Sequence, residues 1–105
     1  MKQIVVKKGR TVMIPVSLGF DASNDSFTSQ IRAEKNSESE LIATWNVSFS
    51  TDGIDGELVL TLDDSVTRDI TRTIGYMDLV RITGGEPIPV FDELLEVYFE
   101  DSISV

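Results

Sequence analysis

"LIATWNVSF", residues 41 to 49, is the stretch that decides the fold class. Its apolar residues stand at every second position: Leu41, Ala43, Trp45, Val47 and Phe49. Side chains alternate between the two faces of a β-strand, whereas a helix repeats its buried stripe about every 3.6 residues. The stretch therefore predicts a β-strand with one buried face, and it predicts that Trp45 is a core residue.

Similar runs lie on both sides of this stretch. They are short, rich in β-branched and aromatic residues, and bounded by clusters of Gly, Asp, Asn and Ser. This organisation is typical of a multi-strand antiparallel fold. We therefore expect an all-β, antiparallel β-sandwich of seven to eight strands that forms one domain over residues 1–105. The predicted strands, besides the first stretch, are residues 3–9, 11–18, 27–34, 57–62, 74–82 and 90–105, the last with an irregular start.

Three local features refine this prediction. Pro15 has no backbone donor, so the strand that contains it should be an edge strand or should carry a bulge. Residues 63–73 break the alternation and predict at most one short helical turn, capped by Asp63 or Asp64. Residues 83–89, "TGGEPIP", predict a turn whose prolines favour extended edge geometry.

Composition excludes several classes of function. The chain has no cysteine and no histidine, so disulfides, thiol nucleophiles, histidine triads and zinc-finger sites are ruled out. Its net charge of −9 disfavours nucleic acid and anionic membranes as partners, because both are bound through clustered Lys and Arg. The apolar run near the start is too short for a signal peptide, and nothing predicts a cofactor.

Charge is distributed unevenly along the chain. Lys7, Lys8 and Arg10 belong to a purely basic start, while the last twenty residues contain acids and no base. One interpretation, which we favour, is that the first and last strands are neighbours within one chain. The other is that the basic edge of one copy meets the acidic edge of the next and forms a ring or stack. The residues predicted to form such assembly edges are Lys7, Lys8, Arg10, Glu93, Glu96 and Glu100.

Acidic residues raise two further possibilities. Two carboxylates suffice for glycoside hydrolysis, and either Asp63 with Asp64 or Asp78 with Glu57 could form such a pair. No spacing brings either pair together, so we expect cap, turn and solvated roles and no enzymatic activity.

Two acidic loops could ligate calcium through oxygen atoms. They are Asp21 to Asp25 and Asp52 to Glu57, and neither fits an EF-hand loop. The simpler interpretation is that both are plain turns.

The order of short motifs resembles a known family. In "KKGRTVMIPV", residues 7–16, an early G-x-T element opens a strand, and Ile31-Arg32 lies in the third predicted strand. The segment from Asp52 to Leu62 follows, then "GYMDL" at residues 75–79, and the chain closes near "DSI". This order resembles small immunoglobulin-like β-sandwich structural proteins of tailed bacteriophages and prophages, such as the N-terminal domains of baseplate and tail proteins. "EPIPVF", residues 86–91, departs from the pattern, which puts the register of the final strand in doubt.

The resemblance implies a non-enzymatic virion, tail or baseplate protein that acts through protein–protein assembly. Its expected partners are other virion or tail proteins, with a possible homo-oligomer, and it would be found in the virion or in the host cytoplasm before assembly. Tyr76 would form a tyrosine corner, with its hydroxyl bonded to a backbone carbonyl a few residues upstream. Asp78 would face solvent or a neighbouring loop. The alternative is a carbohydrate-binding module, for which Phe20 and Phe91, outside the regular strands, are the candidate aromatics.

Overall fold

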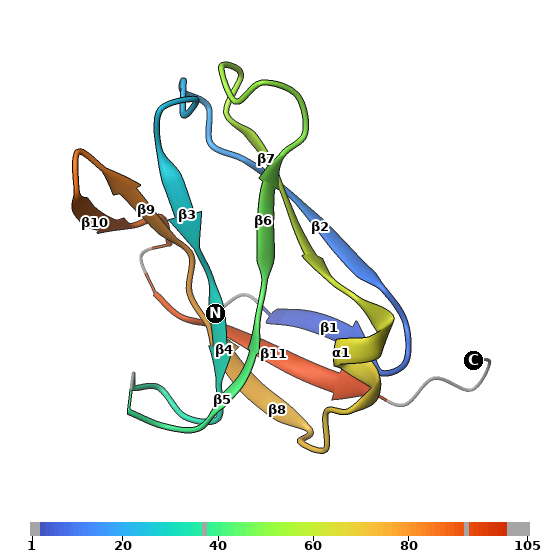
Figure 1. The fold of residues 1–105 in the computed structure, drawn as a ribbon. Helices are drawn as coiled ribbons and strands as arrows, with labels where there is room; N and C mark the ends of the chain where they lie inside the picture. Colours follow the sequence, from blue (N-terminus) through green and yellow to red (C-terminus); the bar gives the residue numbers. More distant parts are fainter. Residues whose placement is uncertain (1–2, 37, 92, 101–105) are drawn as a thin grey trace.

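The structure, a computed structural model, describes residues 3–36, 38–91 and 93–100. Within them the chain is mostly β, with three open sheets and one short helix (Figure 1). The large sheet has five strands in the order β1-β11-β8-β4-β5. These strands are β1 (Gln3–Lys7), β11 (Leu95–Glu100), β8 (Ile74–Met77), β4 (Gln30–Arg32) and β5 (Leu41–Thr44).

Two three-stranded sheets complete the fold. The β9 sheet has the order β10-β9-β3, and the β7 sheet has the order β2-β7-β6. Helix α1 (Asp64–Arg68) connects β7 to β8. The strands of the two sheets are β10 (Glu86–Pro89), β9 (Val80–Thr83), β3 (Ser26–Thr28), β2 (Val12–Ser17), β7 (Glu57–Leu62) and β6 (Asn46–Phe49).

Three long strands pass from one sheet to another. Ser29 separates β3 from β4, Trp45 separates β5 from β6, and Asp78 with Leu79 separates β8 from β9. Each break lies where the chain leaves one set of hydrogen-bonded neighbours and joins another. The described residues therefore form eleven strands, where alternation alone predicted seven to eight uninterrupted ones.

The pairing of strands corrects two expectations. β1 pairs with β11 in parallel along its whole length, so the fold is not purely antiparallel. Residues 86–89, predicted to belong to a turn with extended edge geometry, form the edge strand β10 against β9. The irregular start predicted for the last strand is confirmed, because β11 begins only at Leu95. Residues 101–105 of the predicted strand lie outside the described residues.

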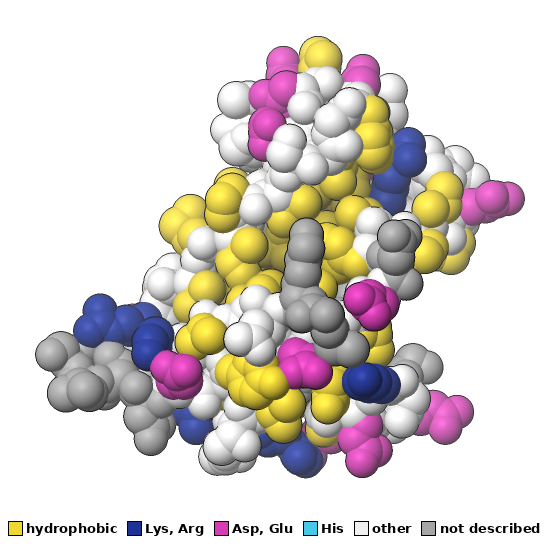
Figure 2. Space-filling view, turned by 180° about the vertical axis from the view of Figure 1, so that it is seen from behind, with side chains coloured by type: hydrophobic (Ala, Val, Ile, Leu, Met, Phe, Trp, Pro, Cys, Tyr) yellow, Lys and Arg dark blue, Asp and Glu magenta, His cyan; other side chains and the backbone are white. Residues whose placement is uncertain are grey.

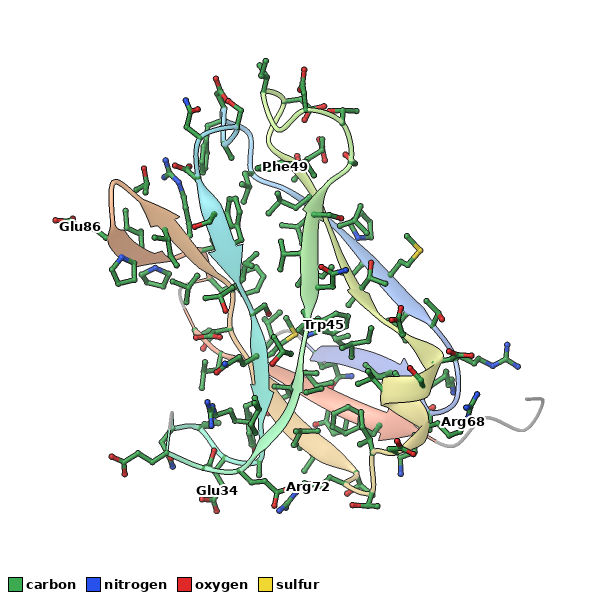
Figure 3. All side chains as sticks on the ribbon, viewed as in Figure 1. Glu34, Trp45, Phe49, Arg68, Arg72 and Glu86 are labelled. Atoms are coloured by element: carbon green, nitrogen blue, oxygen red, sulfur yellow. The ribbon has the colours of Figure 1, made fainter. Side chains whose placement is uncertain are left out.

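The buried core follows the predicted alternation. Leu58, Leu60 and Leu62 are each 1% exposed, and Trp45 points into the interior at 3% (Figure 3). Leu41 is the exception among the predicted inward residues, because it is 44% exposed. The register between β4 and β5 shifts near Ile31, so the neighbour of Leu41 packs against the core in its place. The other members of the core are Val6, Ile31, Ala43, Ile70, Met77, Leu79, Leu95, Val97 and Phe99.

The predicted helical turn is confirmed. Helix α1 begins after Asp63, whose side chain makes no capping hydrogen bond, and Asp64 lies in the first turn. Thr67 attaches the helix to the turn between β1 and β2. Its hydroxyl donates to the carbonyl of Arg10 at 2.7 Å and accepts from the amide of Gly9 at 3.1 Å. No helix in the described part of the chain is long and apolar enough to span a membrane.

The β2–β3 and β6–β7 loops lie together at one end of the molecule (Figure 1). The amide of Leu18 donates to the carbonyl of Gly56 at 2.9 Å, and the amide of Ala22 donates to the carbonyl of Gly53 at 2.9 Å. β2 is an edge strand, as Pro15 predicted.

Candidate functional site

The outer face of the large sheet carries most of the residues singled out by the sequence. Odd-numbered residues of β1 and even-numbered residues of β11 and β8 point away from the core. The strand register places Val5 beside Tyr98 and Tyr98 beside Ile74. These three residues form a partly exposed apolar row across three strands, which we call the outer stripe. Figure 2 shows apolar side chains interspersed with charged ones on this side of the molecule.

The predicted basic and acidic edges are adjacent within one chain. The ammonium of Lys7 lies 2.5 Å from a carboxylate oxygen of Glu100, and both side chains are half exposed. The amide of Lys8 donates to the carbonyl of Glu100 at 2.8 Å. The favoured interpretation, that the first and last strands are neighbours, is therefore confirmed. An exposed ion pair of this kind contributes little stability, about 0–1 kcal/mol.

The remaining predicted edge residues do not form a separate acidic strip. Glu96 accepts a hydrogen bond from the hydroxyl of Tyr98, and this bond raises the pKa of Tyr98. Glu93 is exposed ahead of β11, and Arg10 is exposed in the turn after β1. The charge-driven stack between copies stays a prediction.

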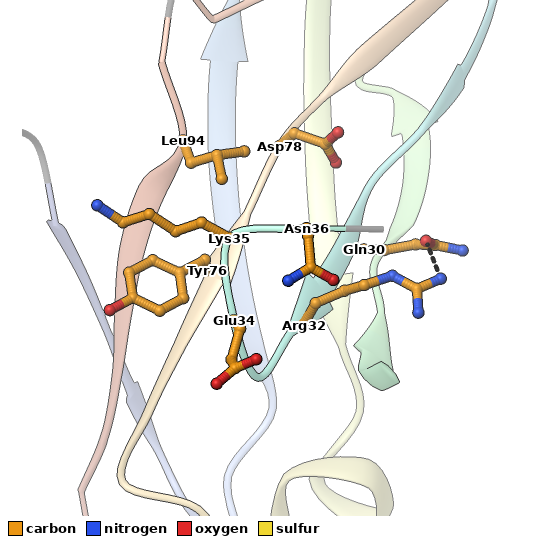
Figure 4. Close-up of a pocket in the computed structure, with 8 residues that line it drawn as sticks. All are labelled: Gln30, Arg32, Glu34, Lys35, Asn36, Tyr76, Asp78 and Leu94. Atoms are coloured by element: carbon orange, nitrogen blue, oxygen red, sulfur yellow. Dashed lines mark hydrogen bonds between the residues drawn. The ribbon is translucent and has the colours of Figure 1, made fainter. Parts of the chain in front are cut away.

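A shallow pocket of about 210 Å³ lies beside Tyr76 (Figure 4). The ammonium of Lys35 sits over the ring of Tyr76, 5.3 Å from its centroid, a cation–π geometry. Arg32 is held by hydrogen bonds to the carbonyl of Ser39 at 2.8 Å and to the side-chain oxygen of Gln30 at 2.9 Å. The pocket is lined by Gln30, Arg32, Glu34, Lys35, Asn36, Tyr76, Asp78 and Leu94.

The environment of Tyr76 differs from the expected tyrosine corner. Tyr76 lies in β8 on the outer face, paired with Glu96, and its ring contacts Lys35. Among the described residues, no hydrogen bond joins its hydroxyl to an upstream carbonyl. Asp78 lines the pocket, as expected for a residue that faces solvent or a loop, and its backbone carbonyl accepts the hydroxyl of Ser29 at 2.5 Å.

The first acidic loop is organised by an ion pair. Arg81 of β9 donates to the carboxylate of Asp25 at 2.5 Å, and the Asp25 side chain is only 7% exposed. The guanidinium of Arg81 also stacks over Phe20, 4.5 Å from the ring centroid. The hydrogen bond from Arg81 lowers the pKa of Asp25, and the amide of Ser23 lowers the pKa of Asp21. Arg81, Asp25 and Phe20 thus form a cluster that joins the loop to the β9 sheet.

The arrangement of the carboxylates in the two acidic loops does not support calcium binding. The carboxylate of Asp25 is engaged by Arg81, and that of Asp21 accepts from the amide and hydroxyl of Ser23. In the second loop, Asp55 accepts from the amide of Glu57 and the hydroxyl of Thr51, which lowers its pKa. Within residues 3–36, 38–91 and 93–100, no three acidic side chains cluster as metal ligands would.

The carboxylates of the two candidate catalytic pairs each have separate structural contacts. Glu57 starts β7 and accepts the hydroxyl of Ser17 at 3.0 Å, while Asp78 lines the pocket beside the large sheet. Asp63 stands at the N-cap position of α1 without a capping side-chain hydrogen bond, and Asp64 faces Arg68 across one helical turn at 3.5 Å.

The aromatic residues expected for sugar binding are engaged as well. Phe20 lies under Arg81, and Phe91 packs against the core.

No known protein family matches this chain. A comparison with curated proteins likewise finds no match.

The interactions that sequence reasoning missed, Lys35 over Tyr76 and Arg81 between Asp25 and Phe20, join residues that are distant in sequence. No local spacing could have indicated them.

Proposed function

We propose that this chain is a non-enzymatic structural protein of a tailed phage or prophage particle, associated with the tail, baseplate or fibre, and that it works by protein–protein assembly. The observation that carries the proposal is the outer stripe. Val5 is 44% exposed, and Tyr98 and Ile74 continue its apolar surface across three strands. A rigid sheet that presents apolar side chains among charged ones suits contact with another protein.

The sheet arrangement supports an immunoglobulin-like frame for this role. When β3–β4, β5–β6 and β8–β9 are each taken as one bent strand, the described residues form eight strands around a common core. Sandwich strands can change sheets at bends, and Trp45 occupies such a bend. The motif order described for the sequence agrees with a phage tail component on this frame.

The proposal is tested in purified particles. The host that encodes the chain is induced or infected, particles are separated on a density gradient, and peptides of the chain are quantified against those of the major tail proteins. A fixed ratio to tail proteins across the particle fractions is expected. A cytosolic enzyme of the host serves as a marker for proteins that are not part of particles. If the chain is absent from the particle fractions and is found with this marker, the proposal is overturned.

The pocket beside Tyr76 supports a second candidate, a carbohydrate-binding module. Sugars stack on aromatic rings and bond to amide and carboxylate groups, and the pocket holds Tyr76, Asn36, Gln30 and Asp78. Calorimetric titration of glycans, with Tyr76→Ala as the control variant, tests this candidate. Trp45 is unsuited as a fluorescent reporter because its side chain is buried in the core. Glycan binding that Tyr76→Ala leaves unchanged would exclude this pocket.

A further inference from the structure

The edges of the three sheets differ in how they are protected. An exposed edge carries unpaired backbone groups and invites another strand to pair with it. β10 is blocked by two prolines. Gly84 and Gly85 both have positive φ and form a two-residue turn, so Thr83 and Glu86 are joined by backbone hydrogen bonds. Because hydrogen-bonded and non-hydrogen-bonded pairs alternate along antiparallel strands, the backbone groups of Pro87 and Pro89 point to the free edge, where neither residue has a donor.

Four other edges are interrupted, covered or opposed. The hydrogen bond from the amide of Leu18 to Gly56 shows that the even-numbered residues of β2 bond to β7. The odd-numbered residues, with Pro15 in the middle of the strand, therefore point their backbone groups to the free edge, where Pro15 has no donor. β5 lies beside α1 and the segment after it, where Arg72 makes two 3.1 Å hydrogen bonds to Glu40. β3 and β6 face each other across a narrow cleft.

Among the residues that the structure describes, none protects the edge of β1 in these ways. The hydrogen bond from the amide of Lys8 to Glu100 shows that even-numbered residues of β1 bond to β11. The backbone groups of Gln3, Val5 and Lys7 therefore point to the free side, where the carbonyl of Lys7 meets the amide of Arg10 at 3.3 Å. The strand contains no proline, its register has no shift, and Val5 is 44% exposed.

We propose that the free edge of β1 pairs with β1 of a second copy, antiparallel and about a two-fold axis at Val5. Val5 would then exchange two hydrogen bonds with Val5 of the second copy. Gln3 would lie opposite Lys7 of the second copy, and the two large sheets would become one continuous sheet. An interface of this kind is self-complementary, as a two-fold dimer requires.

The side chains on the outer face favour a second copy as the occupant. The axis joins two outer stripes end to end, so the two exposed Val5 side chains cover each other and continue the row formed by Tyr98 and Ile74. Within Gln3–Lys7 no lysine faces a lysine, because Lys7 lies opposite uncharged Gln3 and beside Glu100 of its own chain. A register displaced from this axis would no longer place Val5 opposite Val5.

Salt dependence separates this dimer from the charge-driven stack. Each copy carries a net charge of −9, so two copies repel each other at long range, and added salt screens that repulsion. Dimerisation through β1 should therefore strengthen as salt rises. A stack held by basic and acidic edges should weaken instead.

The test is the mass in solution, measured by sedimentation over a wide range of protein concentration. We expect a shift from 11.6 kDa to twice that mass. Val5→Lys places two ammonium groups opposite each other at the axis and should weaken dimerisation roughly tenfold or more. Met13→Lys, on the protected edge strand β2, is the matched control because Met13 is 65% exposed, and it should leave dimerisation unchanged. Thermal melts of both variants show whether each is folded.

A cross-link gives a second readout, since the natural chain has no cysteine. Hydrogen-bonded antiparallel residues have Cβ atoms about 5.5 Å apart, beyond the roughly 3.5–4.5 Å of an unstrained disulfide, so a short bifunctional thiol reagent is used in place of an oxidant. Val5→Cys should be cross-linked rapidly by this reagent, and Met13→Cys should not. A strict monomer, an oligomer other than a dimer, or equal behaviour of the two positions would overturn the inference. It rests on sheet geometry alone, so a dimer that is missing from particles would refute only the proposed function.

Discussion

Gly56 offers the sharpest test of how the loop end of the molecule is built. Its φ is +75°, and a Cβ placed on it would lie 2.3 Å from the carbonyl oxygen of Phe20. That oxygen belongs to the backbone, so it cannot rotate away as the end of a side chain could. The carbonyl of Gly56 also joins the two loops, because it accepts a hydrogen bond from the amide of Leu18. We expect Gly56→Ala to be strongly destabilising.

The magnitude has two parts. A positive φ costs an alanine about 1–2 kcal/mol. Overpacking against an atom that cannot move adds about 1–3 kcal/mol. The total is roughly 2–5 kcal/mol, which lowers the melting temperature of a domain of this size by roughly 10 °C or more.

Gly19→Ala is the matched control. Gly19 has nearly the same φ, +79°, but a Cβ there would meet nothing within 4 Å. It should therefore lose only the backbone part, about 1–2 kcal/mol. Urea unfolding followed by the fluorescence of buried Trp45 measures both variants. Equal losses in the two variants would show that the contact with Phe20 does not constrain the loops.

Three further predictions concern single side chains. Thr67→Val keeps the shape but leaves two backbone groups of the β1–β2 turn without a partner, so it should cost about 1–3 kcal/mol in urea unfolding, while Thr67→Ser should largely restore stability. The pKa of Asp25 lies below its ordinary value of 3.8 in the folded chain, because Arg81 donates to its carboxylate. Its contribution is therefore fully present above about pH 4–5 and is lost as the pH falls below the ordinary value. Urea midpoints should drop over that range, and Arg81→Gln should flatten the drop; an unchanged slope in this variant would exclude the ion pair as its cause. Tyr76→Phe should leave the melting temperature unchanged, since no hydrogen bond of its hydroxyl is found among the described residues. A fall of several degrees would restore the tyrosine corner.

The sequence predicted the faces of the strands better than their partners. Leu58, Leu60 and Leu62 are buried as the alternation required, because that pattern depends only on the geometry of one strand. Leu41 was assigned to the wrong face, since the shift between β4 and β5 is a property of two strands and leaves no mark in either alone. Pro15 correctly indicated an edge strand, because a missing donor is a local fact.

On the outer face of the large sheet, the sequence likewise predicted local properties better than contacts between strands. The charges of Lys7 and Glu100 were visible in the sequence, and their proximity was favoured as one of two interpretations. The parallel direction of β1 and β11 was not predicted, because alternation is identical for parallel and antiparallel neighbours. The contact of Arg81 with Asp25 and Phe20 joins residues more than fifty positions apart.

The sequence by itself determined that this chain is mostly β, which faces of most strands are buried, where a short helical turn lies, and which chemistries its composition excludes. These properties follow from the period of the apolar residues and from the backbone limits of proline and glycine, which act within a few residues. Only the tertiary structure decided where the strands change sheets, that β1 lies at a free edge, and that Val5, Tyr98 and Ile74 form one row. Those features arise from hydrogen bonds and packing between distant segments, whose energy depends on how all the strands are placed together.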